Sequence, residues 1–258
     1  MFLTFQQWFT AEAFGIFLIF TRVGTTFSLL PGFSEAYVPV RIRLLLAIAV
    51  AFVMAPVIQP KLPPTPGTVP GVLMMLGEEI FIGGFLGVVA RSTFTALQTA
   101  GAIIGMQTSL SAAFAFDPST AQQGALTASF LGALALVSIF SADLHYLMLR
   151  AIADSYSLFP AGGTVPIGDF ADVLTRLLSS SFLLGVRIAT PFLVFGVIFF
   201  LGIGILARLM PQMQVFFVTQ PAQILLGLLI FAGTLMAGIS VFMGSFEDAM
   251  AIFIAPNR

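Results

Sequence analysis

The side chains most able to do chemistry in this sequence are charged groups that stand inside long apolar runs. They are Arg22, Glu78, Glu79 and Arg187. A charge near the centre of a lipid bilayer is costly, so each of these groups is expected to be paired or to face water. The chain has no cysteine and a single histidine, which excludes thiolate chemistry and argues against a histidine-based metal site.

Two interpretations of these charges are open. They could form a proton or ion relay, or they could form salt bridges that fix helix positions within the chain or between subunits. On one helix, Glu78 and Arg91 would stand roughly 20 Å apart, too far to pair. The partner of Glu79 is therefore expected on another helix or another chain. Asp143 and His145 are two positions apart, on different sides of a helix, and form no dyad.

The composition is that of a membrane protein. Of the 258 residues, 59% are hydrophobic and 8% are charged, against about 25% charge in a typical soluble domain. So much apolar surface needs lipid or apolar protein around it. The net charge of −1 provides no electrostatic footprint for nucleic acid.

Six apolar blocks predict helices, at residues 13–30, 44–58, 70–105, 125–153, 171–210 and 222–243. As one helix, the fifth block would be roughly 60 Å long, twice the hydrocarbon core of a bilayer. Pro191 within it is expected to kink or break the helix. The third block is also overlong. Long bent helices favour a tall assembly in which apolar faces meet other subunits.

The segment between the third and fourth blocks is rich in small residues and carries bulky apolar side chains. Asp117-Pro118 should end local helicity, because a residue before proline disfavours the helical region. Irregular backbone at membrane depth must be covered by protein or line a cavity. We interpret residues 106–123 as a deformable stopper inside a pore, although Met106 could instead be ordinary helix filling. The candidate plug residues are Met106, Gln107, Phe114, Phe116, Asp117 and Pro118.

Long ordered motifs resemble those of a known family. They include GEEIFIGGFLGVVA at 77–90, GAIIGMQTSLSAAFAFDPSTAQQ at 101–123 and MPQMQVFFVTQPAQILLG at 210–227. Together with the hairpin-like segment 20–51, they make the chain similar to the FliR family of flagellar export-gate proteins. It is more distantly similar to their counterparts in virulence type III secretion. The resemblance covers nearly the whole chain.

The resemblance implies an all-α membrane protein with long kinked helices and helical hairpins, built to pack in a helical multi-subunit assembly. A FliP-like part, residues 1–165 with the plug loop, would precede a FliQ-like hairpin, residues 166–258. The implied partners are FliP-like and FliQ-like subunits, a FlhB-like switch protein and unfolded flagellar proteins in transit. The implied location is the flagellar basal body in the bacterial inner membrane. The hairpin turn that would contact the switch protein carries Arg208, Pro211, Gln212, Phe216 and Pro221.

The function predicted in this way is that of a protein export gate subunit, with no enzymatic activity, no catalytic residues, no cofactor and no metal. The sequence holds no Walker A motif, so energy for export must come from elsewhere. A virulence export apparatus is the alternative within this class. A small-molecule or ion secondary transporter is the alternative from another class and would call for inverted repeats; the sequence shows none. An intramembrane enzyme lacks support, since there is no GxSxG motif and no histidine cluster.

Overall fold

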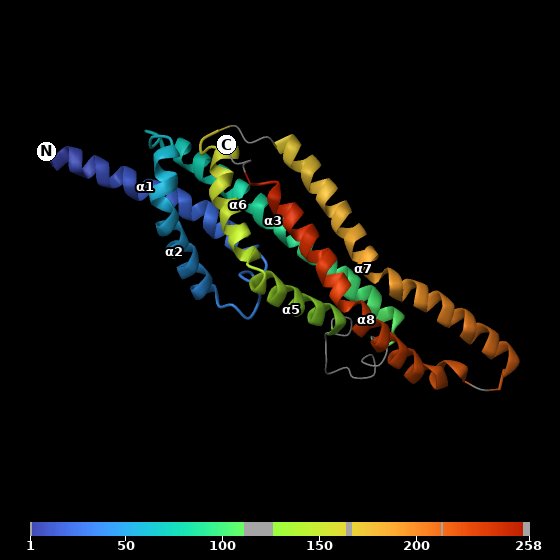
Figure 1. Cartoon of the computed structure of the whole chain (residues 1–258). Helices are drawn as coiled ribbons and strands as arrows, with labels where there is room; N and C mark the ends of the chain where they lie inside the picture. The colour runs from blue at the N-terminus through green and yellow to red at the C-terminus, as the bar shows by residue number, and fades with distance from the viewer. Residues whose placement is uncertain (1, 111–125, 164–166, 213, 255–258) are drawn as a thin grey trace. The chain divides into compact units, whose positions relative to one another are not determined.

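The computed structural model describes residues 2–110, 126–163, 167–212 and 214–254, and every regular element in these ranges is helical. Figure 1 shows their arrangement. The elements are α1 (Phe2–Phe27), α2 (Val40–Ile58), the short 3₁₀ helix η1 (Gln59–Lys61), α3 (Val69–Gln107), α5 (Leu126–Ser141), α6 (Leu144–Leu158), α7 (Ile167–Leu209) and α8 (Val215–Ala251).

The helices have the length and composition of membrane spans. Among the described residues, α2, α3, α7 and α8 are each long and apolar enough to cross a bilayer, and α5 with α6 forms a further, bent candidate. Helices α3, α7 and α8 contain 39, 43 and 37 residues. At 1.5 Å per residue α7 is about 64 Å long, far more than a single crossing needs. The prediction of an all-α membrane protein with overlong helices is confirmed.

The fourth apolar block is not one helix, as the sequence had led us to expect. It divides into α5 and α6, whose axes differ by 74° across the break. Asp143 lies in this break with a left-handed backbone, at φ 59°. A short polar side chain tolerates this conformation better than most residues do, and the conformation ends a right-handed helix. The prediction that Asp143 sits inside a helix is therefore wrong.

The prolines of the last two helices lie inside them. Helix α7 continues through Pro191, so of the two expected effects, a kink or a break, the break does not occur. Helix α7 ends at Leu209, and α8 begins at Val215 and contains Pro221. The prediction that Pro221 marks the end of the turn is wrong. A proline inside a helix removes one backbone hydrogen bond, and the bonds on either side keep the helix intact.

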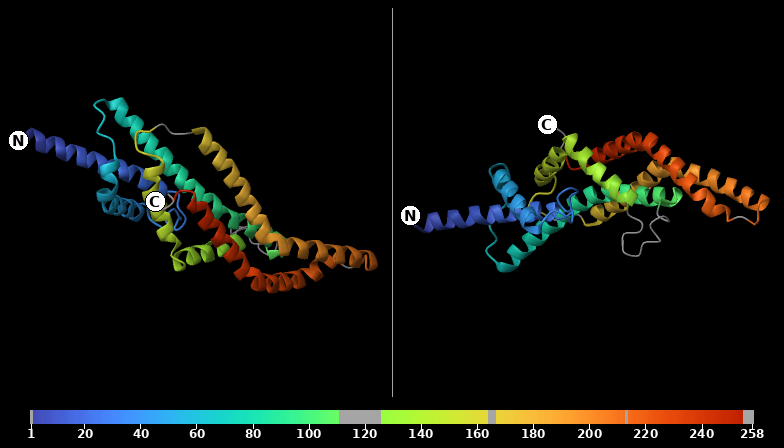
Figure 2. Two further views of the ribbon diagram at one scale, coloured as in Figure 1. Left: turned by 45° about the horizontal axis from the view of Figure 1, so that its top comes forward. Right: turned by 90° about the horizontal axis from the view of Figure 1, so that it is seen from below.

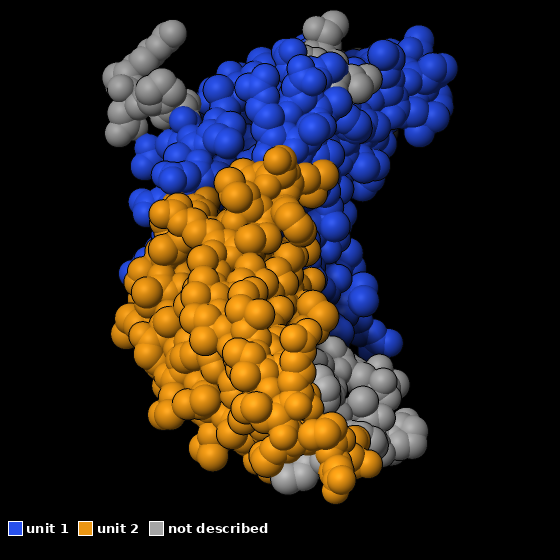
Figure 3. Space-filling model, turned by 90° about the vertical axis from the view of Figure 1, so that its right-hand side faces the viewer, with its two compact units in different colours: residues 1–92, 142–177, 247–258 blue, residues 93–141, 178–246 orange. Residues whose placement is uncertain are grey.

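The chain folds into two compact units, which Figure 3 colours separately. Unit 1 contains residues 1–92, 142–177 and 247–258, and unit 2 contains residues 93–141 and 178–246. In unit 1, α1 packs against α2. Aromatic side chains also join the start of α7 to α3 and to the end of the chain. Phe170 stacks on Phe85 with ring centroids 4.0 Å apart, and Phe253 meets Phe85 edge-on.

Unit 2 is built on the α7–α8 hairpin, which Figure 2 shows from two further sides. Phe192 of α7 and Phe130 of α5 both lie against Phe231 of α8. Helix α5 approaches α3 so closely that a Cβ placed on Gly101 would lie 2.3 Å from the Ala128 backbone. Only glycine fits at such a crossing, the small-residue packing that is common between membrane helices.

Candidate functional site

Arg22 and Glu79 form a fully buried ion pair in unit 1. The Arg22 Nε lies 2.5 Å from Glu79 Oε2, and Nη2 donates a second hydrogen bond of 2.8 Å to Oε1. Neither side chain is exposed. This bidentate geometry matches the planar guanidinium to the planar carboxylate. Glu79 thus has its partner on another helix of the same chain, one of the two possibilities that the sequence left open.

The same guanidinium also contacts α6. Its Nη1 donates to Ser155 Oγ at 3.1 Å, its Nη2 donates to the Phe159 carbonyl at 3.0 Å, and its Cζ lies 3.8 Å from the centre of the Tyr156 ring. One arginine therefore holds α1, α3 and the end of α6 together. Sequence reasoning missed Ser155, Tyr156 and Phe159, because nothing local in α6 marks residues that meet a side chain more than a hundred positions away.

This arrangement favours a structural role over a proton relay. A relay needs a group that gains and loses a proton and has access to water. Arginine stays protonated in proteins, and Glu79 is buried against it. The pair fixes three helices at the place where α3 crosses α1. At that crossing, a Cβ on Gly83 would lie 2.5 Å from the Arg22 carbonyl oxygen.

A second ion pair orders the connection between α1 and α2. Arg91 Nη1 lies 2.8 Å from Glu35 Oε1, and both side chains are partly buried. Arg43 donates from Nε to the Phe33 carbonyl at 2.8 Å. Local desolvation, and then the nearby Glu35 carboxylate, raise the pKa of the Tyr37 hydroxyl, although the side chain as a whole is exposed. The connection is held from both α2 and α3.

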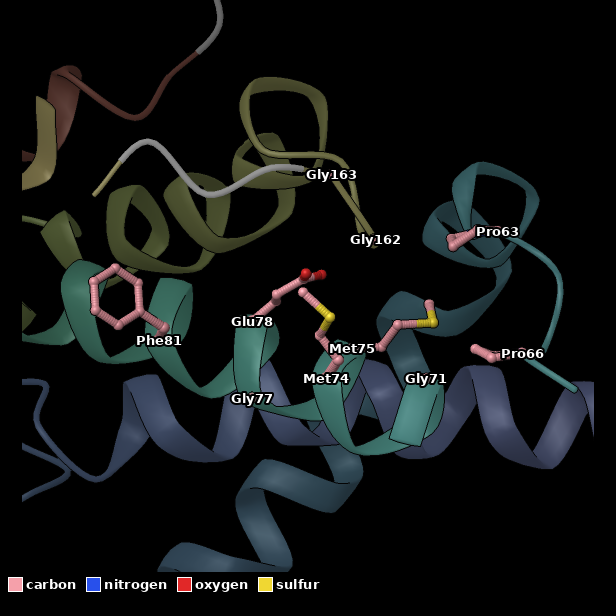
Figure 4. A pocket seen from close by; sticks show the side chains of 10 residues that line it. All are labelled: Pro63, Pro66, Gly71, Met74, Met75, Gly77, Glu78, Phe81, Gly162 and Gly163. Carbon is pink, nitrogen blue, oxygen red and sulfur yellow. The ribbon is translucent and has the colours of Figure 1, made fainter. Parts of the chain in front are cut away.

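Glu78 occupies a different environment from its neighbour Glu79. It lines an open pocket of about 760 Å³ at the start of α3 (Figure 4). Its Oε2 atom is buried and accepts no hydrogen bond from the described residues. The other residues that line this pocket are Pro63, Pro66, Gly71, Met74, Met75, Gly77, Phe81, Gly162 and Gly163.

Arg187 is not buried by its own chain, and its predicted burial against another subunit stays a prediction. Its side chain is exposed near the middle of α7, and Leu183 and Thr190, one turn away on either side, are exposed as well. The apolar run around it suggested burial, but this face of the helix has no cover from the chain itself. The environment of Arg187 is therefore set by what lies outside this chain.

The candidate plug begins later than expected. Met106 and Gln107 belong to the last turn of α3, and the left-handed Ser109, at φ 56°, follows the helix end. Gln223 of α8 is buried and donates from Nε2 to the Gln107 carbonyl at 2.8 Å. This bond satisfies one of the carbonyls that every helix end leaves without a partner. Gln223 was missed, although a glutamine in an apolar helix is a signal.

The other predicted plug residues, Phe114, Phe116, Asp117 and Pro118, lie outside the described residues. The predicted switch-protein contacts lie around the α7–α8 turn. Arg208, Pro211 and Gln212 are exposed there, while Pro221 is exposed early in α8. Phe216 is in α8, and its side chain is outside the described set. Within the described ranges, no group of three or more histidine, aspartate or glutamate side chains could hold a metal ion.

Comparison with known proteins identifies the family. Residues 13–249 match the family described as bacterial export proteins, family 1. The chain is 37% identical to the flagellar biosynthetic protein FliR of Caulobacter vibrioides over 246 residues, which cover 94% of this chain and 98% of that protein. It is 30% identical to FliR of Escherichia coli K12 over 82% of this chain and 80% of that protein. For FliR of Aquifex aeolicus the identity is 28%, over 95% of each chain. The chain therefore belongs to bacterial export protein family 1, the family of these FliR proteins, and is a membrane-embedded component of a flagellar export apparatus.

Proposed function

We propose that this chain is a subunit of the flagellar type III protein export gate in the bacterial inner membrane, where it forms part of a closed pore for unfolded flagellar proteins. The observation that carries this proposal, beyond family membership, is the exposure of α7 and α8. These helices are long, apolar and mostly uncovered by their own chain. Such faces need neighbouring subunits or lipid. FliP-like and FliQ-like chains are the proposed neighbours.

We also propose that the chain consists of two functional parts. Residues 1–165 would act as a FliP-like part and residues 166–258 as a FliQ-like hairpin. In support, α7 and α8 form a hairpin of two long helices joined by a short turn. Co-purification tests the assembly: FliP-like and FliQ-like chains should be isolated with this chain in a fixed ratio. Isolation of this chain without them would contradict it.

Arg187 is a proposed contact between subunits. It stands exposed in the middle of an apolar helix, where an acidic side chain of a neighbour would compensate its charge. Arg187→Glu should lower the recovery of partner chains, and Arg187→Lys should keep most of it. Equal recovery with both variants would show that Arg187 faces lipid headgroups or water instead.

The segment after α3 is the proposed plug, with Phe114, Phe116, Asp117 and Pro118 in its body, and Met106 and Gln107 in the last turn of α3 lead into it. The bond from Gln223 to the Gln107 carbonyl would fix where it leaves α3. Deleting residues 109–118 should leave the complex assembled and raise the passive leakage of ions or small solutes. Membrane conductance, or growth in a small solute that is normally excluded, measures this. If the assembled deletion complex leaks no more than the wild type, the segment is a structural spacer and not a plug.

The α7–α8 turn is the proposed contact with a FlhB-like switch protein on the cytoplasmic side, through Arg208, Pro211, Gln212, Phe216 and Pro221. Exposed side chains at this turn support the idea. A photo-crosslinker at Gln212 should capture that protein. Capture of periplasmic proteins alone would reverse the proposed orientation.

A further inference from the structure

The pocket that contains Glu78 has walls suited to holding a long side chain. Its floor and one wall come from the first turns of α3, another wall from the proline-rich segment before α3, and a third from the turn after α6 (Figure 4). Gly162 in that turn has a left-handed backbone, at φ 73°. Met74 and Phe81 are exposed at 69% and 44%, so the apolar wall faces whatever surrounds the chain.

The Glu78 carboxylate in this pocket has one buried oxygen, Oε2, that lacks a hydrogen-bond partner among the described residues. The nearest ionised neighbour along the helix is Glu79, whose own carboxylate is bound on both oxygens by Arg22. A desolvated carboxylate without a donor is costly, and a like charge beside it adds to that cost. The described residues supply no salt-bridge partner for Glu78, so a cation for this pocket would have to come from elsewhere.

We propose that this pocket receives an arginine or lysine side chain from a neighbouring subunit of the assembly. The aliphatic stem would lie along Met74 and Met75, and the charged head would meet Glu78. The flat ring of Phe81 favours arginine, whose guanidinium stacks on aromatic faces. The inference rests on the proposed function, since it needs a partner subunit. It goes further by naming the place and the charge of the contact.

Three properties of the pocket point to a protein side chain. The pocket is large enough for a side chain together with part of the backbone that carries it. Its wall is apolar, so the stem of a basic side chain gains buried contact area there. The site also lies at the end of an overlong helix, where a neighbouring helix can approach.

The test uses the complete complex, co-expressed with its FliP-like and FliQ-like partners. Glu78→Gln keeps the size of the side chain and removes the charge. The amount of this chain in membranes should stay unchanged, while recovery of partner chains falls roughly tenfold or more, as expected when one member of a buried charge pair is removed. Glu78→Lys should lower recovery further. Glu247→Gln, which removes an exposed carboxylate elsewhere in unit 1, is the matched control and should have no effect.

A photo-crosslinker at Met74 identifies the occupant. It should capture one partner chain at a segment with a basic residue, and an acidic residue placed at that position should restore assembly to Glu78→Lys. Wild-type recovery with Glu78→Gln would overturn the proposal. If the membrane amount of this chain fell as much as the recovery of partner chains, the proposal would also be overturned, because Glu78 would then stabilise the fold of its own chain. Crosslinking to lipid alone would make the occupant a headgroup amine and overturn it too.

These results separate the inference from the function on which it rests. If deletion of the whole gene leaves flagellar export intact, the proposed function fails. If deletion stops export while Glu78→Gln assembles and exports normally, the proposed function stands and only the pocket inference fails.

Discussion

At the scale of residues, one arginine in unit 1, Arg22, holds three helices together. Arg22 and Glu79 are 57 positions apart, and Arg22 donates two hydrogen bonds to Glu79. The sequence showed that each charge needs compensation, because both stand in apolar runs. It could not show that they compensate each other, since no local pattern links two helices. The contacts to Ser155 and Tyr156 were beyond prediction for the same reason.

Removing one member of this pair should be severe. Glu79→Ala or Arg22→Ala leaves the other charge stranded in the core and should cost about 3–5 kcal/mol. The membrane level of the chain and the thermal midpoint of the purified complex both measure this. Arg150→Ala is the control, since Arg150 pairs with Asp154 at an exposed site and surface pairs contribute little.

A double variant separates charge from shape. Arg22→Met with Glu79→Leu leaves no stranded charge and should be more stable than either single alanine variant. If the single variants match the wild type, the pair has no role in holding α1, α3 and α6 together.

At the scale of elements, close helix crossings and breaks set the architecture. At the crossing of α3 with α1, Gly83 faces the Arg22 backbone, and the absence of a side chain allows the close approach. The helix breaks were harder to predict. Proline is a strong signal, yet Pro191 and Pro221 lie inside helices, because one missing bond does not end a long apolar helix. The break at Asp143 rests on a single left-handed residue, which the sequence does not mark.

The crossing at Gly83 gives a sharp prediction. Gly83→Ala forces a methyl group against the Arg22 carbonyl and should destabilise the chain by about 1–3 kcal/mol. The matched control is Gly202→Ala in α7, where an added Cβ meets nothing within 4 Å. That control should be neutral or slightly stabilising, because alanine favours helix over glycine. Thermal midpoints of the two purified complexes decide the matter, and a Gly83→Ala complex as stable as the control would contradict the close crossing.

At the scale of the whole molecule, the class and family could be predicted because several long motifs occur in the right order over nearly the entire chain. The composition alone required a membrane or an apolar assembly. The grouping into two units could not be predicted. Each unit is assembled from separate stretches of sequence, and only contacts in space reveal which stretches belong together.

The chain alone should be poorly stable. Its apolar faces and its charges at Glu78 and Arg187 need neighbours. Expressed by itself, it should aggregate once it is extracted in detergent, and co-expression with FliP-like and FliQ-like partners should keep it monodisperse. Size-exclusion chromatography measures this directly. A monodisperse, thermally stable monomer would argue against an obligate assembly.

The Phe85–Phe253 contact in unit 1 has a consequence for biosynthesis. Phe253 follows Phe85 by more than 160 positions, so the aromatic cluster around Phe85 is completed only after translation has reached Phe253. Until then, the earlier helices are already made, and the packing surface around Phe85 of α3 is still uncovered. Insertion must therefore keep the early helices apart from unrelated apolar segments during synthesis. A truncated product that stops before Phe253 would retain most of its helices and still lack a finished unit 1.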